Sequence, residues 1–225
     1  SFPANDVDTD DTQDSLAYTI LTNPSEGSVT NNGDGTFTFD PGSDFQDLSG
    51  DEEREVTLTY QATDTHNESS GIGTVTIRVT GVNDAPVAND QTILATEDGS
   101  LVGPTSFAGT DVDSDDDQGS LTYNIVNDLG PGQGDVANNN DGTFTFDPNQ
   151  DVDFQSLALG ATTDVSFTYS ATDSHDAASL AAGTVTVRVT GVNDDPVASD
   201  NDYVTSEVDV IFRDVINNET GSGVD

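Results

Sequence analysis

The residues with the clearest chemical potential are aspartates that occur in short runs. Four of the six residues at 6–11 are aspartate, and so are five of the seven residues at 111–117. Because the Asp side chain is short, successive carboxylates on one turn can converge on a single cation. Calcium is a hard cation that takes about six to eight oxygen ligands. The runs therefore predict calcium binding in loops.

Other kinds of metal site fit the sequence less well. An EF-hand loop that starts at Asp6 requires Gly at its sixth position and Glu at its twelfth, where the chain has Asp11 and Ala17. The chain has no cysteine and two histidines, which argues against zinc or copper. Oxygen ligands and a hard cation are the preferred interpretation.

Composition limits the partners that the chain can bind. It has 43 acidic and 4 basic residues among 225, with a formal net charge of −39. Nucleic acids and anionic membranes repel a polyanion, so we expect neither nucleic-acid binding nor direct membrane insertion. Disorder is one alternative for a chain with this charge and 32% hydrophobic residues. A salt-adapted acidic surface is another, although the acids gather in loops.

The two histidines occupy matching positions, in Asp64-Thr65-His66 and in Asp173-Ser174-His175. An aspartate beside an imidazole could orient a catalytic base. However, cysteine is absent and no serine lies in a nucleophile-elbow pattern. Carboxylate pairs that could serve a glycosidase are expected by chance among so many acids. We therefore expect a protein that is not an enzyme.

The sequence repeats itself. Residues 35–41 return unchanged as residues 142–148, and residues 74–84 return as residues 184–194 with one substitution. The offset between the matching blocks grows from 105 to 110 along the chain. Small insertions between fixed blocks indicate loops of variable length between strands.

A third copy begins near the C-terminal end. Glu207 follows Pro196 at the same distance as Glu97 follows Pro86. We expect the chain to be a piece of a longer array. The predicted domains are a repeat without its first strand at residues 1–86, a complete repeat at 87–196, and the start of a third at 197–225.

The pattern of each repeat is typical of β-strands. Apolar and polar side chains alternate over residues 56–62 and 74–80, and the outward positions carry Thr, Gln or Arg. Asn-Gly and Asp-Gly pairs within residues 32–35 and 141–142 predict turns. Several short strands in each repeat predict an all-β fold of tandem Ig-like Greek-key β-sandwiches.

Two motifs give a family resemblance. Each repeat ends in Thr-Gly-Val-Asn-Asp, one further residue and Pro-Val-Ala, at residues 80–88 and 190–198. Phe-Asp-Pro-Gly at residues 39–42 and Tyr-Gln-Ala-Thr-Asp at residues 60–64 are also typical. These motifs resemble those of bacterial cadherin-like repeats, including the VCBS type, in large secreted adhesins. The resemblance implies cadherin-like sandwiches arranged end to end, with calcium bound at their junctions.

The resemblance also implies which residues bind calcium, because a cadherin junction takes ligands from the upstream domain, the linker and the base of the downstream domain. The cadherin Asp-Arg-Glu motif reads Asp-Phe-Gln here, with an amide in place of one carboxylate. The implied ligands at the first junction are Asp44, with Gln46 as a further candidate, and Asn83, Asp84, Asp111, Asp113 and Asp173. Those at the second junction are Glu97, Asp153, Asn193 and Asp194, and those toward a preceding repeat are Asp6, Asp8 and Asp64.

The function that the resemblance implies is a calcium-stiffened extender of a large bacterial surface adhesin. Such a protein would serve cell adhesion or biofilm formation, leave the cell by RTX-type secretion and act outside it. Its partners would be neighbouring repeats, while other domains would contact a cell-surface glycan or protein. The alternative is a carbohydrate-binding or accessory module of a secreted polysaccharide-degrading enzyme, against which the absence of tryptophan argues.

Overall fold

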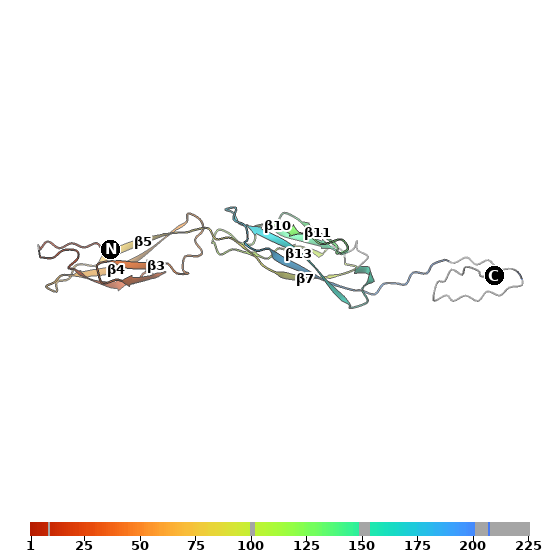
Figure 1. Cartoon of the computed structure of the whole chain (residues 1–225), viewed down its shortest axis with the longest axis horizontal. Coiled ribbons are helices and arrows are strands. Elements are labelled where there is room, and N and C mark those ends of the chain that lie inside the picture. Colours follow the sequence, from red (N-terminus) through yellow and green to blue (C-terminus); the bar gives the residue numbers. More distant parts are fainter. Residues whose placement is uncertain (9, 100–101, 149–153, 201–206, 208–225) are drawn as a thin grey trace. The chain divides into compact units, whose positions relative to one another are not determined.

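The computed structural model describes residues 1–8, 10–99, 102–148, 154–200 and 207, which fall into two units, residues 1–192 and 193–225. The described secondary structure consists of β-strands and one 3-10 turn, η1 (Phe154–Ser156), as Figure 1 shows. The predicted all-β fold is therefore confirmed. Among these residues no helix is long and apolar enough to cross a membrane.

The N-terminal repeat consists of a sheet and a hairpin that enclose a core. Three antiparallel strands form the sheet in the order β1-β4-β5, and β2 pairs with β3 in the hairpin. Tyr18 and Leu58 of the sheet pack with Val29 and Phe37 of the hairpin. The strands are β1 (Ala17–Thr22), β2 (Ser28–Asn31), β3 (Phe37–Asp40), β4 (Glu53–Thr63) and β5 (Gly73–Thr80).

The second repeat has the same plan with additional strands. Its two main sheets have the orders β10-β13-β14-β7 and β11-β12-β8, and β6 pairs with β9. Phe144 of one sheet packs edge-on against Phe167 of the other, so the sheets form a sandwich. The strands are β6 (Val87–Ala88), β7 (Gln91–Thr96), β8 (Val102–Ser106), β9 (Gly109–Thr110), β10 (Thr122–Asn127), β11 (Asp135–Asn138), β12 (Thr143–Asp147), β13 (Thr162–Thr172) and β14 (Gly183–Thr190).

Corresponding strands share even their irregularities. The pairing of β1 with β4 shifts register after Ile20, and the pairing of β10 with β13 shifts after Ile125. Phe2 stacks on Tyr18 with ring centroids 5.1 Å apart, and Phe107 stacks on Tyr123 at 4.9 Å. The repeated sequence therefore folds into repeated structure. Phe2 and Phe107 each lie four residues before the acidic run of their repeat.

One difference between the two repeats lies at the edge of the sheet that contains β5 or β14. In the second repeat β7 runs parallel to β14 and covers its outer side. In the N-terminal repeat β5 pairs with β4, and no other described strand pairs with it. Val185, Val187 and Val189 of β14 are fully buried, whereas the matching Val75, Ile77 and Val79 of β5 are half-buried.

Three arginines that lie in strands pair with nearby acids. The strand predicted at residues 56–62 begins earlier, and its added residues Glu53 and Glu55 are exposed acids. Arg78 of β5 lies 3.4 Å from Glu53 and 2.7 Å from Glu55. Arg188 of β14 pairs with Asp164 at 2.8 Å in the same way. Arg54 of β4 pairs with Asp47 at 2.7 Å and with Glu26 at 3.1 Å.

Candidate metal centre

A buried carboxylate holds the acidic run of the second repeat in place. Asp116 accepts a hydrogen bond from Ser120 Oγ at 2.8 Å and others from the amide and hydroxyl of Ser174, the shortest at 2.9 Å. Its burial alone would raise the pKa of Asp116, but the hydrogen bonds from Ser120 and Ser174 outweigh that effect and lower it. Asp116 therefore acts as an ionised anchor between the run and the loop after β13.

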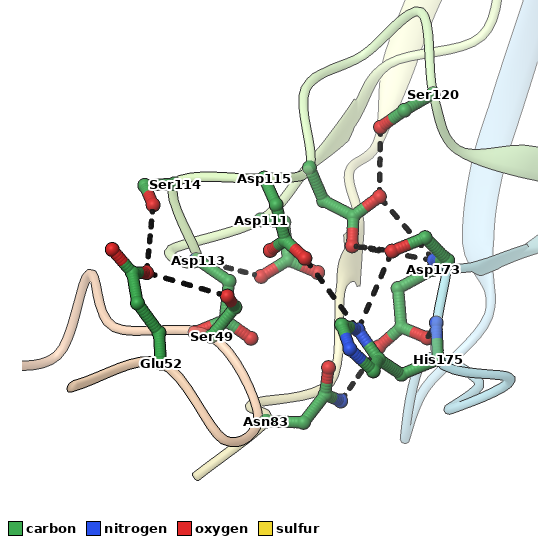
Figure 2. A network of polar contacts seen from close by, with 12 residues as sticks. Ser49, Glu52, Asn83, Asp111, Asp113, Ser114, Asp115, Ser120, Asp173 and His175 are labelled. Carbon is green, nitrogen blue, oxygen red and sulfur yellow. Dashed lines mark hydrogen bonds and ion pairs between the residues drawn. The ribbon is translucent and has the colours of Figure 1, made fainter. Parts of the chain in front are cut away.

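Three further carboxylates, those of Asp111, Asp113 and Asp173, lie in the same region (Figure 2). The amide of Asp113 donates to Asp111 Oδ1 at 3.0 Å, which folds the run into a tight turn. Asp173 Oδ1 accepts hydrogen bonds from the amides of His175 at 2.9 Å and Ala177 at 2.7 Å. One oxygen from each of Asp111, Asp116 and Asp173 lies within 4.8 Å of the other two. Side chains from two distant segments thus converge on one point.

The linker between the repeats contacts these carboxylates. Asn83 Nδ2 donates to Asp173 Oδ2 at 2.8 Å, and the amide of Asp84 donates to Asp113 Oδ2 at 2.8 Å. The structure therefore brings together five of the residues named as ligands for the first junction. These are Asn83, Asp84, Asp111, Asp113 and Asp173.

Three oxygen atoms of this cluster are buried and accept no hydrogen bond: Asn83 Oδ1, Asp111 Oδ2 and Asp113 Oδ1. An unsatisfied buried acceptor costs about 1–3 kcal/mol, and more when it is charged. Asp113 is 3% exposed, and its burial raises its pKa, to which repulsion by Asp111 and Asp84 contributes. Among the described residues, no arginine pairs with Asp111 or Asp113.

The chemistry of the cluster suits a calcium ion. Its free donors are carboxylate and amide oxygens, the ligands that a hard divalent cation prefers. A cation bound there would satisfy the three unpartnered oxygens and neutralise the crowded carboxylates. Asn83 and the acidic run would hold the ion from two sides of the junction.

The N-terminal repeat contributes direct contacts with the acidic run. The amide of Ser114 donates to the carbonyl oxygen of Asp47 at 2.9 Å, and Ser114 Oγ donates to Glu52 Oε2 at 3.3 Å. The same carboxylate oxygen accepts a hydrogen bond from Ser49 Oγ at 3.4 Å (Figure 2). These contacts join the repeats without a metal ion.

The structure does not place Asp44 in this cluster. Its exposed carboxylate accepts a hydrogen bond from the amide of Gly27 at 2.8 Å. Gln46 lies nearer the junction, because it lines a small pocket together with Asp84 and Val82. Of the two upstream candidates, Gln46 is therefore the one that shares a surface with the linker.

The N-terminal repeat has an equivalent carboxylate cluster. Asp6 Oδ1 accepts a hydrogen bond from the amide of Asp8 at 2.9 Å, and Asp64 Oδ1 accepts one from the amide of His66 at 2.8 Å. Asp6, Asp11 and Asp64 each place an oxygen within 4.8 Å of the others. The cluster is more open, since Asp8 is exposed where Asp113 is buried.

Glu97 forms a separate buried site in the first unit. It is fully buried, Oε1 accepts a hydrogen bond from the amide of Val192, and Oε2 has no partner. Asn193 and Asp194 lie in the second unit, where both are exposed. Asp153 lies outside the described residues.

Sequence reasoning missed the anchors of the cluster. Asp11 and Asp116 were part of the predicted runs but were not named as site residues. The sequence does contain a pattern that marks them, because Ser15 follows Asp11 by four residues and Ser120 follows Asp116 by four residues. The hydrogen bonds from these serines to the aspartates measure 3.0 and 2.8 Å. The contact of Glu52 with Ser114 has no comparable signal, because it joins residues 62 positions apart.

Tandem β-sandwiches with acidic loops at a junction and an Asn-Asp linker define a cadherin-like protein. Residues 83–191 match the sequence model of the bacterial cadherin-like domain, and residues 1–79 match that of the bacterial Ig domain. Residues 83–191 therefore form a bacterial cadherin-like domain, and residues 1–79 are similar to a bacterial Ig domain. No curated protein matches the chain in sequence.

Animal cadherin domains are among the similar solved structures. Drosophila N-cadherin domains EC1–4 are 16% identical with a TM-score of 0.49, and the match covers 79% of this chain and 42% of that one. Human mucin-like protocadherin EC1–2 is 14% identical with a TM-score of 0.49, and the match covers 79% and 85%. The chain thus spans less than half of the N-cadherin structure.

Proposed function

We propose that the chain binds calcium at the junction of residues 1–86 and 87–196 and stiffens a bacterial surface adhesin outside the cell. The observation that carries this proposal is the set of three unpartnered buried oxygens on Asn83, Asp111 and Asp113. Cadherin-like domains generally bind calcium, which supports the same conclusion. The role is structural, as is typical of these domain families, rather than enzymatic.

Stiffening follows from where the ligands lie. Asn83 and Asp84 belong to the linker, whereas Asp111, Asp113 and Asp173 belong to the second repeat. One ion bound to both groups would fix the linker on the repeat. Glu97 with Asp153, Asn193 and Asp194 would serve a second junction, and Asp6, Asp8 and Asp64 a preceding one.

The carbohydrate-binding alternative finds less support. Sugar rings stack on exposed aromatic side chains, and the described Phe and Tyr rings are buried or half-buried. The described acidic sites, in contrast, suit a cation. An adhesive role in the parent protein would then belong to other domains, with these repeats as its extender.

Calcium should raise the melting temperature of the chain, because it binds the assembled junction and not the scattered aspartates of the unfolded chain. Extracellular calcium modules have dissociation constants of about 10⁻⁴ to 10⁻³ M. A calcium concentration 100 times the dissociation constant would add about 2.7 kcal/mol to the free energy of unfolding. Melting curves with calcium and with chelator, at constant ionic strength, measure the effect.

Sodium chloride at the same ionic strength is the control for general charge screening. Superimposable curves in calcium and in sodium would contradict calcium binding and would favour the salt-adapted surface.

A further inference from the structure

The turn between β2 and β3 carries an Asn-Gly pair, Asn32-Gly33, that the proposed function does not use. In such a pair the backbone nitrogen of the glycine can attack the side-chain amide of the asparagine, because glycine has no Cβ to crowd a close approach. Both residues are exposed, and a Cβ built on Gly33 would meet no atom within 4 Å. Water and base therefore reach the pair freely.

The second repeat contains the same turn without this glycine. Residues 31–41 return as residues 138–148 with one substitution, which places Asn140 where the first turn has Gly33. Gly33 has a φ of +80° and Asn140 a φ of +59°, so both residues lie in the left-handed region. Asn139-Asn140 is therefore an internal control for Asn32-Gly33, with the same fold and one different side chain.

Hydrogen bonds hold the reacting groups of the first turn in place. Asn32 Nδ2 donates to Thr36 Oγ1 at 2.8 Å, and the amide of Gly33 donates to Asn31 Oδ1 at 3.0 Å. The equivalent hydrogen bonds of the second turn measure 2.8 and 2.9 Å. Attack requires the Gly33 nitrogen to lose its proton and to approach Asn32 Cγ, so both hydrogen bonds must break. The reaction therefore needs local opening of the turn.

We propose that Asn32 is a site of spontaneous deamidation that the folded turn restrains. The deprotonated nitrogen of Gly33 forms a bond to Asn32 Cγ, the bond from Cγ to Nδ2 breaks, and ammonia leaves with a proton taken from water. Water then opens the cyclic imide at one of its two carbonyl groups, which gives aspartate or isoaspartate at this position. The reaction consumes one water and releases one ammonia, and it does not depend on calcium.

The two products affect the fold differently. Aspartate keeps the backbone and adds one negative charge, whereas isoaspartate adds a methylene group to the backbone of the turn. The carbonyl oxygen of Gly35, in the same turn, accepts a hydrogen bond from the amide of Phe2 at 2.9 Å. Phe2 is fully buried and stacks on Tyr18. A longer backbone displaces Gly35 from Phe2, so isoaspartate should loosen the hairpin from the core and lower the melting temperature.

Reciprocal substitutions test the site. Gly33→Asn copies the second turn and should abolish deamidation at Asn32, while Asn140→Gly copies the first turn and should create a new site at Asn139. Each protein is incubated at mildly alkaline pH, folded and in guanidinium chloride, and the products are measured by peptide mass spectrometry. In the original chain, product should form at Asn32 well before it forms at Asn139. Equal rates at the two positions, or no product at Asn32 in guanidinium chloride, would overturn the proposal.

The restraint by the turn has its own test. Thr36→Val removes the hydroxyl that accepts from Asn32 with little change in shape, so it should speed deamidation in the folded protein and leave the rate in guanidinium chloride unchanged. Thr36→Ser keeps the hydroxyl and should keep the slow rate of the folded protein. A folded chain that reacts as fast as the denatured one, or a Thr36→Val variant that reacts no faster than the original, would show that the turn does not restrain Asn32.

Discussion

Asp113 and Asp34 are the same amino acid with opposite effects on the folded state. The hydrogen bonds from the hydroxyl and amide of Thr36 lower the pKa of Asp34, so its charged form favours folding. Burial raises the pKa of Asp113, so its charged form opposes folding when no cation is bound. The contrast arises because Asp113 lies under the linker while Asp34 lies in an exposed turn.

Asp113→Asn should therefore change stability and calcium binding in opposite directions. Without calcium the variant should melt at a higher temperature than the original chain, because a buried charge is removed. Its calcium affinity should fall by about 10–100-fold, the range typical for the loss of a partner at a metal site. Calorimetric titration and melting curves in chelator measure the two effects.

Asp34→Asn is the matched control, because it removes one carboxylate with little change in shape. It should lower the melting temperature slightly and leave calcium affinity unchanged. Equal losses of affinity in the two variants would show that the junction is not the binding site.

The raised pKa of Asp113 also predicts how stability depends on pH. The pKa of Asp113 is 3.8 in the unfolded chain and higher in the folded chain. Between these two pKa values the folded state holds a proton that the unfolded state has lost. Without calcium, the free energy of unfolding should therefore fall as pH rises through this range. The stabilisation by calcium should disappear on acidification through the same range, because protons compete with the ion.

Asp34, Asp47 and Asp164 should act in the opposite direction and at lower pH. Their pKa values are lowered by hydrogen bonds from Thr36, Arg54 and Arg188, so the stability they provide is lost as pH falls below 3.8. Urea unfolding of the metal-free chain at a series of pH values measures the free energy of unfolding. The fall with rising pH that is assigned to Asp113 should be absent in Asp113→Asn. An unchanged pH profile in that variant would contradict the assignment.

At the scale of elements, β5 and β14 are matching strands whose side chains are buried to different extents, so the effect of burial can be compared within one molecule. Val75 and Val185 occupy the same position in the repeat, but Val185 is covered by β7 and fully buried. Val185→Ala should cost about 2 kcal/mol of unfolding free energy, from two lost methyl groups and the cavity they leave. Val75→Ala should cost roughly half as much, because its site is half-buried. Equilibrium unfolding in urea measures both.

Most elements were predictable from local pattern, because alternation and Asn-Gly or Asp-Gly turns act over a few residues. The strands around residues 56–62 and 74–80 and the turn at Gly142, where φ is +83°, follow from such patterns. The early start of β4 at Glu53 was not predictable in this way. Arg78 on the neighbouring strand compensates its acids, and such pairing is non-local.

The candidate site was predictable to the extent that its residues repeat. The linker and the Asp runs recur, and the structure brings Asn83, Asp84, Asp111, Asp113 and Asp173 together. Asp44 was placed by a motif that departs from the cadherin one, and its side chain binds Gly27. Side-chain direction at such a position depends on the local turn, which spacing in the sequence does not specify.

At the scale of the whole molecule, the junction between the repeats has hydrogen bonds that need no ion and carboxylates that come together only around a cation. The hydrogen bonds of Ser114 with Asp47 and Glu52 need no ion. The carboxylates of Asp84, Asp111, Asp113 and Asp173 repel one another until a cation binds between them. Calcium removal should therefore loosen the angle between the repeats without separating them.

Small-angle scattering with calcium and with chelator measures this loosening. We expect a stiff arrangement with calcium and a wider spread of dimensions after chelation. The spread of dimensions of the Asp113→Asn variant should lie between these two limits. With chelator it should be narrower than that of the original chain, because one repelling charge is removed. With calcium it should be wider, because one ligand is lost. A distribution of dimensions that chelation leaves unchanged would contradict calcium stiffening even if calcium binds.

The arginines of the strands have a consequence for the survival of the chain outside a cell. A protease that cleaves after Lys or Arg finds four sites in 225 residues, since lysine is absent. Arg54, Arg78 and Arg188 lie within β4, β5 and β14, and each is held by one or two carboxylates. Cleavage requires an extended, unpaired segment, so a strand must first unfold locally. Arg213, the fourth site, lies outside the described residues. At the three described sites, pairing with carboxylates within strands makes the folded chain a poor substrate for trypsin-like enzymes.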